Sequence, residues 1–338
     1  MTTTKDNQQK LPPRKDISFR AGRPGRLSAR ESSRITKRIT MLSVGIGVLL
    51  ITIKLIVFRE SGSVGILSSL VHSSLDLIAA LSSFFAVRFA ARAPDERYRF
   101  GRGKAEGFSA VLQVCLITLA AVHLLETAAE KVETAHTLTH GGYAIAAMVF
   151  AILLTTWLLI AQSWAIKATG SLAVKGDRAH FIADMSANVA VILGIILTSQ
   201  NIFPRADAFV GVGIALWLFY TAYRVGRLAW SQLMDQELPE KERMLIKELA
   251  MQDKRINGVH DLRTRAAGPH VHIQMQLDLA DQLSLSEAHD IVVLAEQRMM
   301  EAYPAADILI HPHPAGCHHQ HGNAIFKQNQ NHEHKHNH

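Results

Sequence analysis

The sequence predicts an α-helical membrane protein, with six transmembrane helices followed by a small cytoplasmic α+β domain. Several stretches of about twenty residues carry almost no charge, and that is the length needed to cross the hydrocarbon core of a bilayer. Residues 40–58 and 143–163 are the clearest, and Lys54 interrupts the first only near its end. After residue 235 the composition becomes charged, and the apolar residues follow the periods of short helices and strands. The chain therefore divides into a membrane part and a folded domain outside the membrane.

Six spans are expected from the apolar stretches, and four segments follow from them. The predicted spans are residues 39–58, 64–91, 106–127, 143–166, 177–199 and 208–233. The predicted segments are a basic N-terminal tail (1–38), the membrane domain (39–235), a cytoplasmic α+β domain (236–316) and a His-rich tail (317–338). The last is of low complexity and is expected to have no fixed fold.

The lysine and arginine residues beside the spans predict the orientation of the chain. One side of the membrane receives only Arg59, Lys131 and Arg205. The other side receives twelve basic residues: Arg30, Arg34, Lys37, Arg38, Arg92, Arg97, Arg99, Arg102, Lys104, Lys167, Lys175 and Arg178. Because basic loops stay in the cytoplasm, both termini are predicted to be cytoplasmic, as an even number of spans requires.

The charged segment after the last span reads as helix, strand, strand, helix and strand. These elements are expected at Glu240–Met251, Asn257–Arg265, His270–Leu279, Ser286–Tyr303 and Asp307–His311. Gly268-Pro269 predicts the turn between the first two strands, and Ser284 or Ser286 can cap the second helix. An αββαβ order predicts a ferredoxin-like or metallochaperone-like sandwich, with two helices on one face of a sheet.

Two His-x-x-x-Asp pairs lie inside otherwise apolar segments: His72 with Asp76, and His180 with Asp184. A spacing of four residues places both side chains of a pair on one helix face. An ionisable group in hydrocarbon costs roughly 2.5–3.5 kcal/mol, so four of them need a reason. Two imidazoles and two carboxylates complete a tetrahedral shell for zinc or a similar divalent ion. The alternative is a self-contained His–Asp hydrogen bond in each pair, but two matching pairs favour one metal site. Asp177, one turn before His180, is a candidate supporting or entry group for the metal, or else a polar residue that packs between helices.

The composition argues against several other classes of protein. The formal charge of +7 lies mostly in the N-terminal segment and the loops, and the membrane interpretation explains it without a nucleic-acid partner. Two cysteines, Cys115 and Cys317, provide neither a disulfide framework nor a cysteine zinc cluster. A metallo-hydrolase would need an open coordination position and a general base, and the sequence has no HExxH motif. A channel or a sensor remains an alternative, although a tetrahedral site binds tightly whereas a channel site should bind weakly.

Three further motifs carry a family resemblance. They are Phe100-Gly-Arg-Gly-Lys-Ala-Glu106 before the third span, Leu233-Met-Asp235 after the sixth, and Gly258-Val-His-Asp-Leu-Arg-Thr-Arg265 in the cytoplasmic domain. With the two His-x-x-x-Asp pairs, they make residues 38–315 resemble the cation diffusion facilitator family, most closely the bacterial zinc and iron efflux transporters.

The resemblance implies a homodimeric secondary transporter, not an enzyme, that exports divalent cations from the cytoplasm in exchange for protons. His72, Asp76, His180 and Asp184 would bind the transported ion. Zinc is expected as the substrate and as a regulatory ligand, with cadmium, iron and cobalt as further substrates and with no organic cofactor. The chain would be a multi-pass protein among the lipids of a bacterial inner membrane.

The resemblance also implies two further functional groups of residues. In the cytoplasmic domain, His260, His289 and His311 match metal ligands, while Gln276 and His313 stand where the family has His and Asp. Lys104 and Asp235 match a charge interlock that pairs across the dimer. A second family site, in the loop after the second span, is expected to be absent, because only Asp95 is kept and Tyr98 and Arg102 replace its histidines.

Overall fold

The computed structural model describes residues 24–61, 64–133, 142–199 and 206–315 of the 338-residue chain. By compactness the chain forms two units. The first contains the long helices up to Pro239 together with Thr264–Ile273 and Met300–Asp307. The second contains Glu240–Arg263, Gln274–Met299 and the segment that starts at Ile308.

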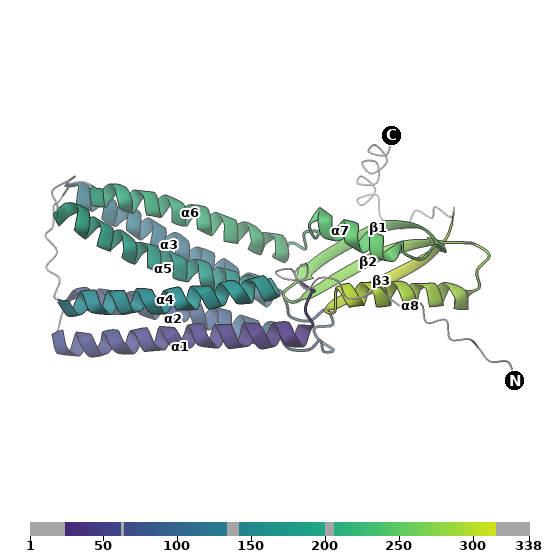
Figure 1. The fold of residues 1–338 in the computed structure, drawn as a ribbon, viewed down its shortest axis with the longest axis horizontal. Coiled ribbons are helices and arrows are strands. Elements are labelled where there is room, and N and C mark those ends of the chain that lie inside the picture. Colours follow the sequence, from purple (N-terminus) through teal and green to yellow (C-terminus); the bar gives the residue numbers. More distant parts are fainter. Residues whose placement is uncertain (1–23, 62–63, 134–141, 200–205, 316–338) are drawn as a thin grey trace. The chain divides into compact units, whose positions relative to one another are not determined.

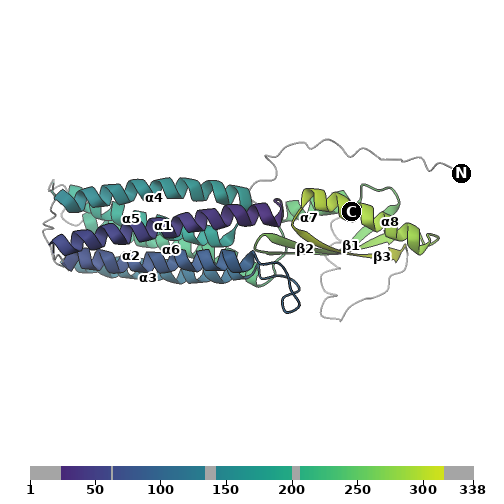
Figure 2. The same cartoon turned by 90° about the horizontal axis from the view of Figure 1, so that it is seen from below.

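The described part of the first unit holds six helices of 27 to 33 residues, which run side by side in Figures 1 and 2. They are α1 (Ala29–Ser61), α2 (Val64–Ala90), α3 (Ala105–Glu133), α4 (Gly142–Thr169), α5 (Leu172–Ser199) and α6 (Ala206–Leu233). Within the described ranges, α1, α2, α3, α4 and α6 are long and apolar enough to cross a membrane. The remaining helix, α5, has a similar length but carries His180, Asp184 and the charged residues before them. The predicted six-helix architecture is confirmed.

Helix α1 begins at Ala29, well before the predicted start at residue 39. Ser28 and Glu31 explain the difference, because they form a capping box. The Glu31 amide donates to the Ser28 hydroxyl oxygen (3.3 Å), and the Ser28 hydroxyl donates to the Glu31 carboxylate (2.7 Å). A helix can therefore begin within the basic segment, outside the apolar stretch.

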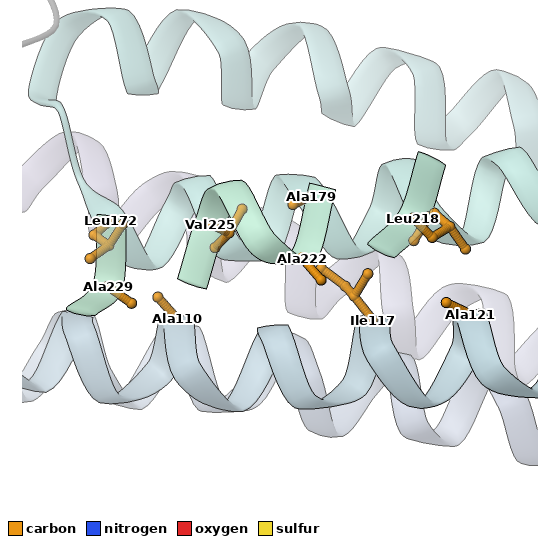
Figure 3. Close-up of a cluster of buried hydrophobic side chains, with 10 residues drawn as sticks. Ala110, Ile117, Ala121, Leu172, Ala179, Leu218, Ala222, Val225 and Ala229 are labelled. Atoms are coloured by element: carbon orange, nitrogen blue, oxygen red, sulfur yellow. The ribbon is translucent and has the colours of Figure 1, made fainter. Parts of the chain in front are cut away.

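Helix α5 occupies the centre of the bundle. One of its faces packs against α3 and α6, where small alanine side chains allow close approach of the helices. Figure 3 shows nine of these residues: Ala110, Ile117, Ala121, Leu172, Ala179, Leu218, Ala222, Val225 and Ala229. Another face packs against α1 and α4, where Phe181 meets Ile46, Leu158 and Leu159. Neighbouring residues of α5, such as Ala179 and Phe181, therefore face different helices.

The N-terminus of α5 is capped by a residue distant in sequence. Glu106, on α3, is buried, and its Oε2 accepts hydrogen bonds from the Ser171 hydroxyl (2.6 Å) and the Leu172 amide (3.0 Å). The Ala173 amide lies 3.4 Å from the same oxygen. A carboxylate at this position also interacts favourably with the positive end of the helix dipole. Glu106 therefore fixes the start of the helix that carries His180.

The C-terminal segment forms the predicted αββαβ order. Its elements are α7 (Glu240–Ala250), β1 (Ile256–Ala267), β2 (His270–Leu279), α8 (Leu285–Ala302) and β3 (Ala306–Pro314). The strands form a sheet in the order β1-β2-β3, and Figure 2 shows α7 and α8 on the same side of it. Ser284, rather than Ser286, caps α8 in a capping box with Glu287.

Replacing Glu106 with alanine should destabilise the protein, because donors at the buried start of α5 would lose their acceptor. The expected loss is about 1–3 kcal/mol of unfolding free energy. It is measured as a lower thermal unfolding temperature in detergent. Glu126→Ala is the matched control, because Glu126 lies exposed on the same helix. Equal unfolding temperatures for the two variants would show that Glu106 does not stabilise α5.

Candidate metal centre

The two His-x-x-x-Asp pairs lie on α2 and α5, and a buried contact joins them. His180 Nε2, on α5, lies 2.9 Å from Asp76 Oδ1, on α2. Only 5% of His180 and 7% of Asp76 is exposed, so the contact is shielded from solvent. The histidine of one pair therefore meets the aspartate of the other, although 104 residues separate them in sequence.

This contact bears on the choice between one shared site and two separate His–Asp pairs. The Nε2 atom of His180 is directed at the neighbouring helix, as a shared site requires. Asp184 is half-buried, one turn further along α5. His72 belongs to α2, but its side chain lies outside the described residues. Among the side chains that the structure describes, no three His, Cys, Asp or Glu residues are grouped closely enough to hold a metal ion. Of the three described members of the predicted site, Asp76 and His180 are thus in contact, and Asp184 is not grouped with them as a metal site.

The chemistry of this pair suits a divalent cation. Carboxylate oxygen and imidazole nitrogen are both zinc ligands, and zinc–ligand distances are about 2.0–2.2 Å. An Nε2–Oδ1 separation of 2.9 Å leaves the two atoms in direct contact, so they would have to move slightly apart to share an ion. Buried His180 Nδ1 has no hydrogen-bond partner in the described part of the chain. The imidazole can therefore rotate or change tautomer without breaking a second bond.

A lysine of α1 contacts α2 one turn before Asp76. Lys54, on α1, donates from Nζ to the hydroxyl oxygen of Ser73 (2.5 Å), which is buried on α2 between His72 and Asp76. Lys54 thus contacts α2. The sequence showed only that this lysine interrupts an apolar stretch, and it did not reveal the partner. A lysine inside the membrane domain that contacts α2 is a second indication that this part of the bundle accommodates charged groups.

Comparison with known proteins identifies the family. The model of the cation efflux transmembrane domain matches residues 40–234, and that of the cation efflux protein cytoplasmic domain matches residues 238–315. The chain belongs to the cation diffusion facilitator family. Proteins named cation-efflux pump FieF, from Serratia proteamaculans and Cronobacter sakazakii, are each 34% identical to it. The matches cover 83% of this chain in both cases, and 94% and 93% of the respective relatives. This facilitator is therefore a cation efflux transporter rather than an enzyme.

In the loop between α2 and α3, Asp95, which matches a family metal ligand, is bound by other residues of the same loop. Asp95 Oδ1 accepts hydrogen bonds from the amides of Arg97 (3.1 Å) and Tyr98 (2.9 Å), and its Oδ2 pairs with Arg102. The hydrogen bond from Arg102, followed by that from the Tyr98 amide, lowers the pKa of Asp95 below its usual value. The Arg102 guanidinium also lies 4.3 Å from the centre of the Tyr98 ring. The Asp95 carboxylate is thus already paired with the guanidinium group of Arg102.

The predicted cytoplasmic ligands lie on three different elements. His260, on β1, pairs through Nε2 with Asp278 Oδ2, on β2, at 2.6 Å. Gly258 makes room for this pair, since a Cβ there would lie 2.9 Å from His260 Nε2. The rings of His311 and His313, on β3, are 4.5 Å apart between centres, and His289 is exposed on α8. These four histidines are among the described residues that form no three-ligand group within one chain.

Lys104 and Asp235 are paired within one chain. Lys104 Nζ lies 2.9 Å from Asp235 Oδ2 and 3.2 Å from the Leu233 carbonyl oxygen. Arg265 Nη1 lies 3.2 Å from the same carboxylate oxygen. Burial alone would raise the pKa of Asp235, but the hydrogen bond and charge of Lys104, with those of Arg265, outweigh it and hold the pKa below its usual value. Pairing across a dimer, which the resemblance implies, stays a prediction.

Asp235 has a second role, at the end of α6. Its φ of 53° places it in the left-handed region, and the Gln236 amide donates to the Ser231 carbonyl oxygen at 2.8 Å. This bond is the long hydrogen bond of a Schellman motif, in which a left-handed residue ends the helix. Asp235 therefore combines a backbone conformation that aspartate tolerates with a charge that two basic residues use.

Two residues near the predicted sites were missed from sequence. Asp278 could have been found, because it lies two residues after Gln276 on the same face of a predicted strand. Gln162, on α4, donates from Nε2 to Asp177 Oδ2 at 2.8 Å. It could not have been found from sequence, since a single glutamine in an apolar helix has no motif around it.

Substitutions at Asp235 should separate charge from conformation. Asparagine tolerates the left-handed backbone, so Asp235→Asn should cost only the partly exposed ion pairs, about 0–1 kcal/mol. Asp235→Ala should cost about 1–2 kcal/mol more in backbone strain. Because folding lowers the pKa of Asp235, its charge contribution should be complete above the ordinary aspartate pKa of about 3.9 and disappear as pH falls through the lower folded value. Thermal unfolding of the three proteins at several pH values measures both effects. Equal stability of the two variants would rule out the conformational role.

Proposed function

We propose that this facilitator exports divalent metal cations, preferably zinc, from the cytoplasm by exchange for protons. The ion binds between α2 and α5, in a tetrahedral site of His72, Asp76, His180 and Asp184. The observation that carries this proposal is the buried contact of 2.9 Å between His180 Nε2 and Asp76 Oδ1, which joins the two motif-bearing helices at their ligand atoms.

The proton coupling follows from the competition of protons and metal for the same atoms. With neutral imidazoles and ionised carboxylates the site carries a charge near −2, which a divalent cation neutralises. Histidine must be deprotonated to bind zinc, so metal binding releases protons and protonation releases metal. An inward proton gradient would therefore drive the ion out of the cell.

The preference for zinc follows from the ligand set. Imidazole suits zinc and other late transition metals, whereas magnesium and manganese favour sites made only of oxygen ligands. His72 would provide the second imidazole. Cadmium, iron and cobalt are further candidate substrates, because they also accept mixed nitrogen and oxygen ligands.

The other assignments complete the proposal. The transporter is a homodimer in a bacterial inner membrane, with six spans and both termini in the cytoplasm. Residues 39–235 form the transport domain, and residues 236–316 form a dimerisation domain where His260, His289, His311 and His313 bind regulatory zinc. The basic tail (1–38) and the His-rich tail (317–338) flank these two domains. Lys104 and Asp235 form a charge interlock across the dimer.

Removing one ligand should abolish zinc transport. His180→Ala and Asp184→Ala, reconstituted in sealed vesicles with a pH gradient, should accumulate zinc no faster than empty vesicles, because three ligands leave an incomplete shell. His123→Ala should transport zinc like the wild type, since His123 lies exposed on α3. Normal zinc accumulation by His180→Ala would sink the assignment. Accumulation that never exceeds the equilibrium level in the wild type would identify a channel instead.

The pH dependence of zinc binding tests the competition directly. Two histidine ligands give a slope of log affinity against pH that approaches about two in acid and zero in alkali, over the range of about pH 5 to 8 where histidine changes charge. Zinc titration calorimetry should use a variant that ends at residue 316 and lacks His260, His289, His311 and His313. A flat profile would show that protons do not compete with zinc, and antiport through these ligands would have to be abandoned.

A further inference from the structure

One turn before His180, a polar cluster joins three helices inside the membrane domain. Asp177 on α5, Gln162 on α4 and Ser43 on α1 are all fully buried, with 0% exposure. Gln162 Nε2 donates to Asp177 Oδ2 at 2.8 Å and to Ser43 Oγ at 3.1 Å. Because an isolated carboxylate in an apolar interior is very costly, the protonation state of Asp177 depends on the donors around it.

The cluster contains more acceptors than donors. Asp177 Oδ1 and Gln162 Oε1 are buried, and neither has a hydrogen-bond partner in the described part of the chain. Exchanging the amide oxygen and nitrogen of Gln162 would not correct this, because its oxygen would then face the carboxylate. The Ser43 hydroxyl supplies one proton, which can be directed either to the Ile39 carbonyl or to the carboxyl of Asp177. One hydrogen-bond donor is missing.

The neighbouring charged groups do not supply that donor. On α5, the basic residues on either side of Asp177 have other partners: Lys175 interacts with Glu106, and Arg178 Nε donates to the Ser163 hydroxyl oxygen at 2.9 Å. His180 interacts electrostatically with Asp177. Its Nε2 atom is already bound to Asp76, so it does not donate to Asp177. The two other helices of the cluster face Asp177 with the neutral side chains of Ser43 and Gln162.

We infer that Asp177 carries a proton in this conformation, and that it is a proton-binding site of the exporter separate from the metal ligands. A carboxylic acid has one O–H donor, which is the donor that the cluster lacks. The neutral acid completes a hydrogen-bonded clasp of Asp177, Gln162 and Ser43 that holds α5 to α1 and α4. The clasp lies one helical turn from His180, so its state affects the position of a metal ligand.

Loss of the proton would loosen the clasp. The O–H bond of Asp177 breaks, its electron pair stays on the carboxylate, and the proton passes to water. The resulting anion keeps the amide donor of Gln162 at Oδ2, but its Oδ1 finds no donor among the described residues of this apolar interior. This favours a conformation in which α5 moves away from α1 and α4 and the carboxylate is hydrated. A proton taken from water on the other side of the membrane restores the acid. This role in transport rests on the proposed antiport, whereas the bound proton itself does not.

Infrared difference spectroscopy of the purified full-length protein tests the bound proton. A neutral carboxylic acid has a carbonyl stretching band apart from the amide and carboxylate bands. We expect the wild type to show such a band at neutral pH and Asp177→Asn to lack it. Asparagine has nearly the shape of the neutral acid and can donate from its amide, so this variant should fold. Asp278→Asn, which removes a carboxyl group outside the membrane domain, should leave the band unchanged.

A second variant tests whether the infrared band comes from the carboxyl group that is hydrogen-bonded to Gln162. Gln162→Met removes the amide partner and keeps Asp177, so the band should shift to the position of a less hydrogen-bonded acid. A spectrum of Asp177→Asn that retains the full band, or a band that Gln162→Met does not move, would overturn the inference.

The role in coupling has its own measurement. Counting protons and zinc ions moved by reconstituted vesicles should give a lower proton-to-zinc ratio for Asp177→Asn than for the wild type, because asparagine cannot exchange a proton. An unchanged ratio would overturn the coupling role. If the wild type itself moved no protons, the proposed antiport would fail, and the infrared band would still decide whether Asp177 is protonated.

Discussion

The arrangement of the membrane domain depends on one constraint: charged side chains inside apolar helices must find partners inside the protein. The bond between His180 and Asp76 meets this requirement across the bundle and thereby fixes the register of α5 against α2. Separating these helices would leave a carboxylate and an imidazole exposed to hydrocarbon. A divalent cation bound to both atoms would meet the same requirement.

Helix α5 concentrates such constraints. Glu106 on α3 caps its first turn, Gln162 on α4 binds Asp177 in the second, and Asp76 on α2 binds His180 in the third. Between these contacts, Phe181 and the small residues of Figure 3 pack against apolar neighbours. A movement of α5 therefore changes the environment of buried acidic groups and of the proposed metal ligand His180 together. This is the physical basis on which binding of ions and protons can be coupled to a change in helix packing.

Elements that depend on local pattern were predictable, whereas contacts between distant residues were predictable only where a motif pointed to them. The five C-terminal elements agree with their predicted bounds within a few residues, because apolar periodicity and the Gly268-Pro269 turn are local signals. The start of α1 was misplaced, since the capping box at Ser28 lies outside the apolar stretch. The two matching pairs predicted one shared site, but spacing could not show that Asp76 and His180 would be the two members in direct contact. The pairing of Asp95 with Arg102 was equally hidden, although the replacement of two histidines in that loop was visible.

Locating bound zinc tests most directly whether the contact between Asp76 and His180 opens to hold the transported ion. A structure of the zinc-loaded protein, with anomalous scattering measured at the zinc absorption edge, would place the ion. We expect a zinc peak between α2 and α5, about 2.0–2.2 Å from both His180 Nε2 and Asp76 Oδ1, with His72 and Asp184 completing the shell. Zinc bound elsewhere in the membrane domain, with His180 Nε2 still hydrogen-bonded to Asp76, would contradict it.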